Sequence, residues 1–258
     1  IVDIPNANFK AALIADGIDT SGDNEIQVSE AQTVTTTIDV GGEGIADLTG
    51  IEEFINIQTL DVGSNSLTSV DLTNNTEIVE LRIENNNLTS LDVSALTDLL
   101  TLNCYSNDLT SLDVSQNAGI KTLQAHNNPF GSIDLSNNTE LLLLNVSNTG
   151  LSSLDLTNNT KIHSLYVYEN SISTLDISVL SDLDRFWCYD NDLTTLNTSN
   201  NGVLDDLRAF GNQLSAMDLS NNTQLTELEV QDNLLTSLNV KNGNNSNFTQ
   251  FDATGNPD

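Results

Sequence analysis

Residues 57–67 read IQTLDVGSNSL, which fits the pattern LxxLxLxxNxL with Ile and Val at two of the aliphatic places. The pattern returns at residues 78, 99, 120, 141, 162, 183, 204 and 225, each copy 21 residues after the last. A further copy, FTQFDATGNPD, begins at residue 248 and ends within a repeat, which leaves open a continuation of the natural chain. A degenerate first copy surrounds Ile38, Val40 and Ile45. Such a fixed period indicates a repeat architecture.

Apolar and polar residues alternate at the start of each copy. Leu60 and Val62, for example, are separated and flanked by Thr59, Asp61 and Gly63. This alternation predicts a short β-strand with one buried face. A single 21-residue unit cannot bury that face alone, whereas stacked units bury a continuous core. The sequence therefore predicts stacked repeats, each with a half-buried strand.

An asparagine follows the strand in most copies. We expect its amide to point inward and to satisfy backbone groups of the turn that have no other partner. The predicted role of this Asn column is structural, and its members are Asn65, Asn86, Asn107, Asn128, Asn170, Asn191, Asn212 and Asn233.

These motifs resemble the leucine-rich-repeat family over residues 35–258, in about ten repeats. The second halves of the units, such as LTSLDVSQN and LSSLDLTNN, are similar to the short nested bacterial variant. The resemblance implies a mainly-β, right-handed solenoid with a parallel sheet on its concave face. It also implies a bacterial protein that is extracellular or on the cell surface. Residues 1–34 are predicted to form a small helical cap that covers the exposed end of the core.

The outward strand positions collect all four tyrosines, the only tryptophan and all three arginines. Because strands stack about 4.8 Å apart, rings and guanidinium groups of neighbouring repeats should meet. Trp, Tyr and Arg are enriched at binding hot spots. The candidate ligand-binding residues are Tyr105, His126, Tyr166, Tyr168, Arg185, Trp187, Tyr189, Arg208 and Phe210.

Several readings of this surface stay open from the sequence alone. The ligand could be a protein or a glycan, since aromatic rings serve both. Aromatic columns also stabilise sheets through cross-strand pairs, which is the packing alternative. A structural spacer of a larger surface protein is the main functional alternative, and an accessory of a polysaccharide-active enzyme is a minor one.

A second set of outward positions repeats Ser or Thr, then Asp, then Ser or Thr. Each Asp is expected to accept a backbone N–H at a turn. A cation-binding ladder and a flat ice-binding array are the functional alternatives. The Asp column comprises Asp71, Asp92, Asp113, Asp134, Asp155, Asp176 and Asp218, with Asn197 and Asn239 in its gaps.

Residues 19–30, DTSGDNEIQVSE, are similar to an EF-hand or dockerin-type calcium loop. The resemblance assigns a structural Ca²⁺ to Asp19, Ser21, Asp23, the Glu25 carbonyl and a bidentate Glu30. The sequence departs from the pattern at Asn24, where Gly normally makes the turn; Asn tolerates positive φ better than most residues. Asn6 is expected to cap a helix through FKAALIADG.

The composition excludes several functions. With 37 acidic and 7 basic residues, the net charge of −30 disfavours nucleic-acid binding. No apolar run approaches the ~20 residues of a membrane span. Cys104 and Cys188 occupy one inward position four repeats apart, so they are expected to be buried free thiols. No catalytic constellation is apparent, so we expect a protein that is not an enzyme. We also expect it to be a monomer.

Overall fold

The computed structural model describes residues 1–257, so Asp258, the last residue of the final copy, lies outside the described residues. The chain divides into two compact units, Ile1–Asn128 and Pro129–Asp258. Each unit is described by itself. The predicted boundary between a cap (1–34) and a solenoid (35–258) stays a prediction.

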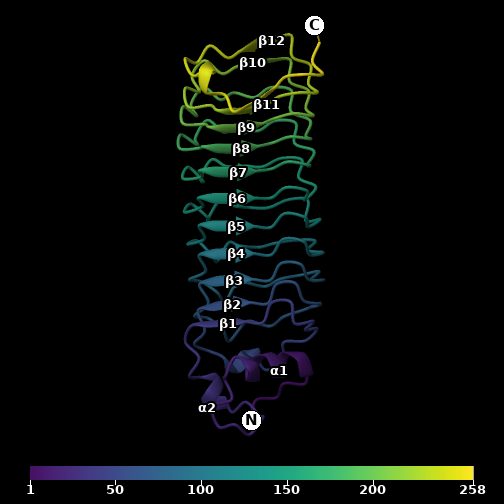
Figure 1. Cartoon of the computed structure of the whole chain (residues 1–258), viewed down its shortest axis with the longest axis vertical. Coiled ribbons are helices and arrows are strands. Elements are labelled where there is room, and N and C mark those ends of the chain that lie inside the picture. Colours follow the sequence, from purple (N-terminus) through teal and green to yellow (C-terminus); the bar gives the residue numbers. More distant parts are fainter. Residues whose placement is uncertain (258) are drawn as a thin grey trace. The chain divides into compact units, whose positions relative to one another are not determined.

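Unit 1 begins with helix α1 (Ala7–Ala15) and the short helix α2 (Val28–Ala31), followed by five parallel strands and one 3-10 turn. Figure 1 shows these strands as a regular stack, with the helices before its first strand. Each strand pairs in register with the next, so Leu60 faces Leu81 and Leu81 faces Leu102. The strands are β1 (Thr37–Asp39), β2 (Thr59–Asp61), β3 (Glu80–Arg82), β4 (Thr101–Asn103) and β5 (Thr122–Gln124), and the turn is η1 (Ile51–Glu53).

Unit 2 repeats this arrangement in six further strands, again parallel and in register. A separate pair, β10 (Ala216–Asp218) and β12 (Ser237–Asn239), forms where the Asp column runs. The six strands are β6 (Leu143–Asn145), β7 (Ser164–Tyr166), β8 (Arg185–Trp187), β9 (Asp206–Arg208), β11 (Glu227–Glu229) and β13 (Gln250–Asp252); η2 (Asn245–Asn247) precedes the last.

The core of each unit is the column of inward strand residues, as the alternation predicted. Leu60 and Val62 are fully buried in unit 1, and so are Phe186 and Cys188 in unit 2. The predicted fold class, a mainly-β stack of parallel strands in repeated turns, is confirmed. Helix α1 is capped as expected, since the Asn6 side chain accepts a hydrogen bond from the Phe9 N–H at 3.0 Å.

The predicted Asn column is structural. In unit 1, Asn107 accepts the Leu88 N–H at 3.0 Å and donates to the Ile83 and Cys104 carbonyls at 3.0 and 3.1 Å. Each amide therefore joins its own repeat to the preceding one. Where the sequence has Thr149 instead, its hydroxyl donates to the Val146 carbonyl at 2.7 Å.

A second Asn column was not recognised from the sequence. Asn201, for example, is fully buried and donates to the Ile177 and Leu180 carbonyls at 3.1 and 2.7 Å. The signal was the recurring Asn pair in LTNN and LSNN, of which only the second residue points inward. The column comprises Asn75, Asn117, Asn138, Asn159, Asn201 and Asn222.

Both cysteines are free and fully buried, as predicted. Burial raises the pKa of the Cys104 thiol to about 12, and burial also raises the pKa of the Cys188 thiol. A thiol in this state is protonated at physiological pH and behaves as a small apolar core residue.

Candidate functional site

Strand alternation turns the rare rings of unit 2 outward. Trp187 and Tyr189 are partly exposed. Phe186, which precedes Trp187, and Cys188, which lies between the two, are fully buried. In-register pairing then places Tyr166 opposite Trp187 and Trp187 opposite Arg208. The aromatic–Arg surface of unit 2 consists of Tyr166, Tyr168, Arg185, Trp187, Tyr189, Arg208 and Phe210.

Three of these rings form one continuous stack. The Tyr168 and Tyr189 centroids lie 4.4 Å apart with an interplanar angle of 7°, and Tyr189 and Phe210 lie 4.4 Å apart at 8°. Tyr189 therefore has a ring against each of its faces. Burial, followed by the nearby Tyr168, Glu169 and Asp190, raises the pKa of Tyr189 to about 12, so the phenol stays neutral.

Trp187 also has neighbours on both sides. Tyr166 meets it at a centroid distance of 4.8 Å and 73°, and the Arg208 guanidinium carbon lies 4.3 Å from the centroid of the Trp187 ring. Such cation–π contacts contribute about 0.5–2 kcal/mol. The indole Nε1 donates to Asp206 Oδ2 at 2.8 Å.

Asp206 is the residue of this surface that sequence reasoning missed. It is buried, and besides the indole it accepts from Arg208 Nε at 3.2 Å and lies 3.7 Å from Arg185 Nε. An outward Asp among 37 acidic residues gives no distinguishing signal. Only the register shows it between two arginines and the indole.

The two arginines of the surface differ in exposure. Arg208 is held by Asp206 and, at 3.1 Å, by Glu227. Arg185 keeps half of its side chain exposed, and its Nη1 donates weakly to the Tyr166 hydroxyl at 3.4 Å. Arg185 is thus the guanidinium of this surface with the greater freedom to meet a ligand.

The other two candidate residues belong to unit 1. Tyr105 and His126 stack on each other at 4.4 Å and 11°. Burial lowers the pKa of His126. Tyr105 and His126 occupy equivalent outward positions of neighbouring repeats, as the stacked rings of unit 2 do. Each unit thus carries its own aromatic stack.

The Asp column has the turn geometry predicted for it. Asp71 Oδ1 accepts the Thr73 N–H at 3.0 Å, and Asp155 Oδ1 accepts the Thr157 N–H at 3.0 Å. Asn197 makes the same bond to the Ser199 N–H at 3.1 Å. The side chain at this column therefore serves its own turn, with or without a charge.

The N-terminal loop has the backbone bend that its calcium-loop likeness requires. Asn24 has φ 63°, the left-handed conformation usually supplied there by Gly. Asp19 accepts the Gly22 and Asn24 N–H groups at 2.8 Å each. Glu30 accepts the Gln27 and Ser21 N–H groups at 2.8 Å each, and these bonds lower its pKa. The oxygen donors suit a hard cation, although each carboxylate also anchors the loop backbone.

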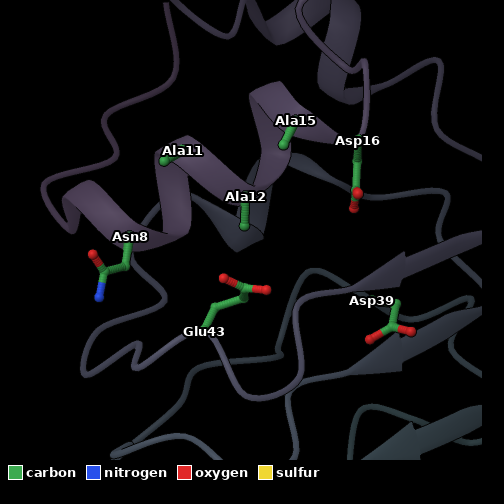
Figure 2. Close-up of a pocket in the computed structure, with 7 residues that line it drawn as sticks. All are labelled: Asn8, Ala11, Ala12, Ala15, Asp16, Asp39 and Glu43. Carbon is green, nitrogen blue, oxygen red and sulfur yellow. The ribbon is translucent and has the colours of Figure 1, made fainter.

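A pocket of about 310 Å³ lies beside α1. In Figure 2, Ala12 and Asp16 line it from the helix and its C-terminal end, and Asp39 and Glu43 line it from the opposite side. Burial and these two neighbours raise the pKa of Asp16. Within residues 1–257, no three His, Cys, Asp or Glu side chains converge closely enough for a metal ion. Across the same residues, no helix is long and apolar enough to span a membrane.

The repeat, the register and the Asn columns define a leucine-rich-repeat fold, and similar solved structures agree. The functional domain of InlJ from Listeria monocytogenes, described as including a cysteine ladder, is 33% identical with a TM-score of 0.92, over 97% of this chain and 60% of that one. This chain thus spans about 60% of that protein's chain. An internalin (inlF) from the same species is 21% identical with a TM-score of 0.65, over 98% of this chain and 90% of that one.

A plant peptide hormone receptor, RGFR1, solved in complex with RGF2, has a TM-score of 0.76 at 21% identity, over 90% of this chain and 42% of that one. These neighbours are leucine-rich-repeat proteins, of which inlF is described as an internalin and RGFR1 as a receptor. No protein-family model matches the sequence. No curated protein matches it either.

Proposed function

We propose that this chain is an extracellular or cell-surface bacterial binding protein that recognises a protein ligand through the aromatic–Arg surface of unit 2. The observation that carries the proposal is the network around Trp187. Tyr166, Arg208 and Asp206 hold the indole on an open sheet face rather than in the core. A preorganised cluster of Trp, Tyr and Arg loses little freedom on binding, which is how hot spots gain affinity.

The ring geometry favours a protein over a glycan as the ligand. Sugars stack on open aromatic faces, but both faces of Tyr189 are covered by Tyr168 and Phe210. Trp187 likewise has Arg208 and Tyr166 beside it. The surface therefore offers ring edges, phenol groups and Arg185, which suit a polypeptide with mixed polar and apolar groups.

Similarity to the functional domain of InlJ supports a binding role. The likeness to RGFR1 concerns the fold alone. The extracellular location rests on the leucine-rich-repeat resemblance of the sequence.

The test is a paired screen on arrays of purified extracellular proteins and of glycans. The double variant Trp187→Ala, Tyr189→Ala should lose the protein signals of the wild type while remaining folded by circular dichroism. The matched control is Phe248→Ala, Phe251→Ala, which removes an aromatic pair of unit 2 outside the surface. Retention of all signals by the first variant would favour the spacer reading, and signals confined to glycans would favour a lectin.

A structural Ca²⁺ in the N-terminal loop is a separate proposal. Its support is the left-handed backbone at Asn24 and the spacing of Asp19, Asp23 and Glu30 along the loop. In the structure their carboxylates accept backbone N–H groups of the loop and do not converge, so Ca²⁺ binding requires them to turn toward a common point. Bound Ca²⁺ would be coordinated by oxygen atoms from several positions of the loop and so hold those positions together. Thermal unfolding with Ca²⁺ or with a chelator tests it: Ca²⁺ should raise the Tm of the wild type but not of Asp19→Asn, Asp23→Asn. An equal Tm in Ca²⁺ and in chelator would contradict it.

A further inference from the structure

A column of turn residues in unit 2 borders the aromatic stack. Glu169 directly follows Tyr168, and Asp190 directly follows Tyr189. Their N–H groups donate to the Tyr189 and Phe210 carbonyls at 3.0 Å, so these turns stack repeat over repeat. The acidic edge is defined as Glu169, Asp190 and Asp232, all of them exposed.

This column has a left-handed backbone in both units. In unit 1 its positions are held by Ser64, Asn85, Ser106 and Asn127, with φ between 53° and 56°. In unit 2, Glu169, Asp190 and Asp232 adopt φ 54°, 51° and 52°. Gly, Asn and Asp are the residues that tolerate this conformation best, whereas Glu has no local advantage there.

The choice of Glu at residue 169 is therefore unfavourable for folding on two counts. Glu169 is strained in a left-handed turn, and Glu169 and Asp190 place like charges about one strand spacing apart. Gly211 continues the column at φ 62°, and the Asp190 carboxylate lies where a side chain at residue 211 would begin. Backbone strain that persists against local preference points to a functional site.

The arginines nearby do not neutralise this edge. Arg208 is paired with Asp206 and Glu227, and the Arg185 Nε lies 3.7 Å from Asp206. Among the ion pairs of residues 1–257, none involves Glu169, Asp190 or Asp232. The aromatic stack thus has a row of unpaired negative charges along one side, in a chain of net charge −30.

We propose that the partner of the aromatic–Arg surface is a basic polypeptide segment, whose apolar side chains cover the Tyr168–Tyr189–Phe210 stack while its Lys or Arg side chains pair with the acidic edge. This inference rests on the proposed function and adds the chemistry of the ligand. Charge complementarity of this kind steers association and fixes register, and it weakens as salt rises.

The only tryptophan of the chain reports binding at this surface by its fluorescence. Three short peptides of alternating Val with Lys, Gln or Glu serve as probes. The Lys peptide should change Trp187 emission saturably, and its affinity should fall at least about tenfold when NaCl is raised from about 0.05 to about 0.5 M. Tighter or equal binding of the Gln or Glu peptide would overturn the inference, and so would binding of none of the three.

Two variants that each remove two negative charges distinguish the local effect of the acidic edge on affinity from the effect of the overall negative charge of the protein. Glu169→Asn, Asp190→Asn should weaken the Lys peptide about fivefold or more and keep its fold, because Asn already occupies this column at residues 85 and 127. Asp155→Asn, Asp176→Asn should leave affinity unchanged; Asn197 shows that Asn fits that column. Equal weakening by both variants would overturn the inference.

Calorimetry with Trp187→Ala, Tyr189→Ala distinguishes the failure of the two proposals. This variant keeps every acidic residue, so undiminished binding of the Lys peptide would contradict the location of the site and with it the proposed function. If the wild type preferred the Gln or Glu peptide and this variant lost that binding, the location of the site would be supported. Only the inference of a basic partner would then be overturned.

Discussion

The indole Nε1 of Trp187 donates to Asp206 Oδ2 at 2.8 Å, and Asp206 also holds Arg208 at 3.2 Å. The strand residues Arg185 and Asp206 pair in register, which brings one buried carboxylate between two guanidinium groups and the indole. The orientation of the exposed aromatic ring thus depends on a single acidic side chain in the neighbouring repeat.

Removal of Asp206 should loosen this surface. We expect Asp206→Ala to lower the free energy of unfolding by about 2 kcal/mol, because hydrogen bonds to a charged group are lost and two arginines face each other. Asp206→Asn can still accept the indole N–H and should cost less. Urea unfolding gives the stabilities, and Trp187 emission gives the ring environment; identical spectra for wild type and Asp206→Ala would contradict this role.

The Asn column should carry a large share of the stability of each repeat. Asn107→Ala leaves the buried Leu88 N–H and the Ile83 carbonyl without their partner, which should cost about 3 kcal/mol. Asn107→Thr is the matched control, since Thr149 fills the equivalent position and bonds a carbonyl. The prediction fails if alanine and threonine prove equally stable in denaturant unfolding.

His126 should make unit 1 less stable in mild acid. Burial lowers its pKa below the ordinary 6.5, so its contribution to stability is full above about pH 6.5 and is lost as pH falls through the folded-state pKa. His126→Phe should remove this loss and keep the stack, as Phe210 does beside Tyr189 in unit 2. Unfolding at pH 7 and pH 5 checks it; the same pH dependence in the variant would refute the assignment.

Relief of strain at Glu169 should stabilise the protein. Glu169→Asn places a residue tolerant of φ 54° in the left-handed turn and should raise the free energy of unfolding by about 1 kcal/mol. Ser64→Asn offers a comparison at φ 56° without a change of charge. No gain from Glu169→Asn at high salt, where charge repulsion is screened, would show that the turn is not strained.

Much of this fold could be predicted because its period fixes the direction of every side chain. A strict interval of 21 residues settled that Phe186 and Cys188 point inward and Trp187 outward. It also identified the first Asn column and the turn bonds of the Asp column. The first Asn column stands at a fixed place in the repeat motif, so its role could be predicted. The second column lies in Asn–Asn pairs, and the pattern does not say which residue of a pair is buried.

The network of the site was less predictable, since contacts between repeats depend on side-chain rotamers rather than on the period. The repeat placed Asp206 at an outward strand position, but nothing in the sequence showed that it would be buried between two arginines and the indole. Ring-to-ring stacking at 4.4 Å likewise follows from the rotamers. The strain at Glu169 could be recognised only from backbone angles, because a Glu in a turn looks unremarkable until its φ is known.

The most direct test of the binding surface is the affinity of a protein captured in the array screen for two variants of this chain. Trp187→Ala, Tyr189→Ala should weaken that affinity by about 100-fold or more, as expected when two hot-spot residues are truncated, while Phe248→Ala, Phe251→Ala leaves it within about twofold. Equal affinity of the first variant and the wild type, with both folded, would contradict the account.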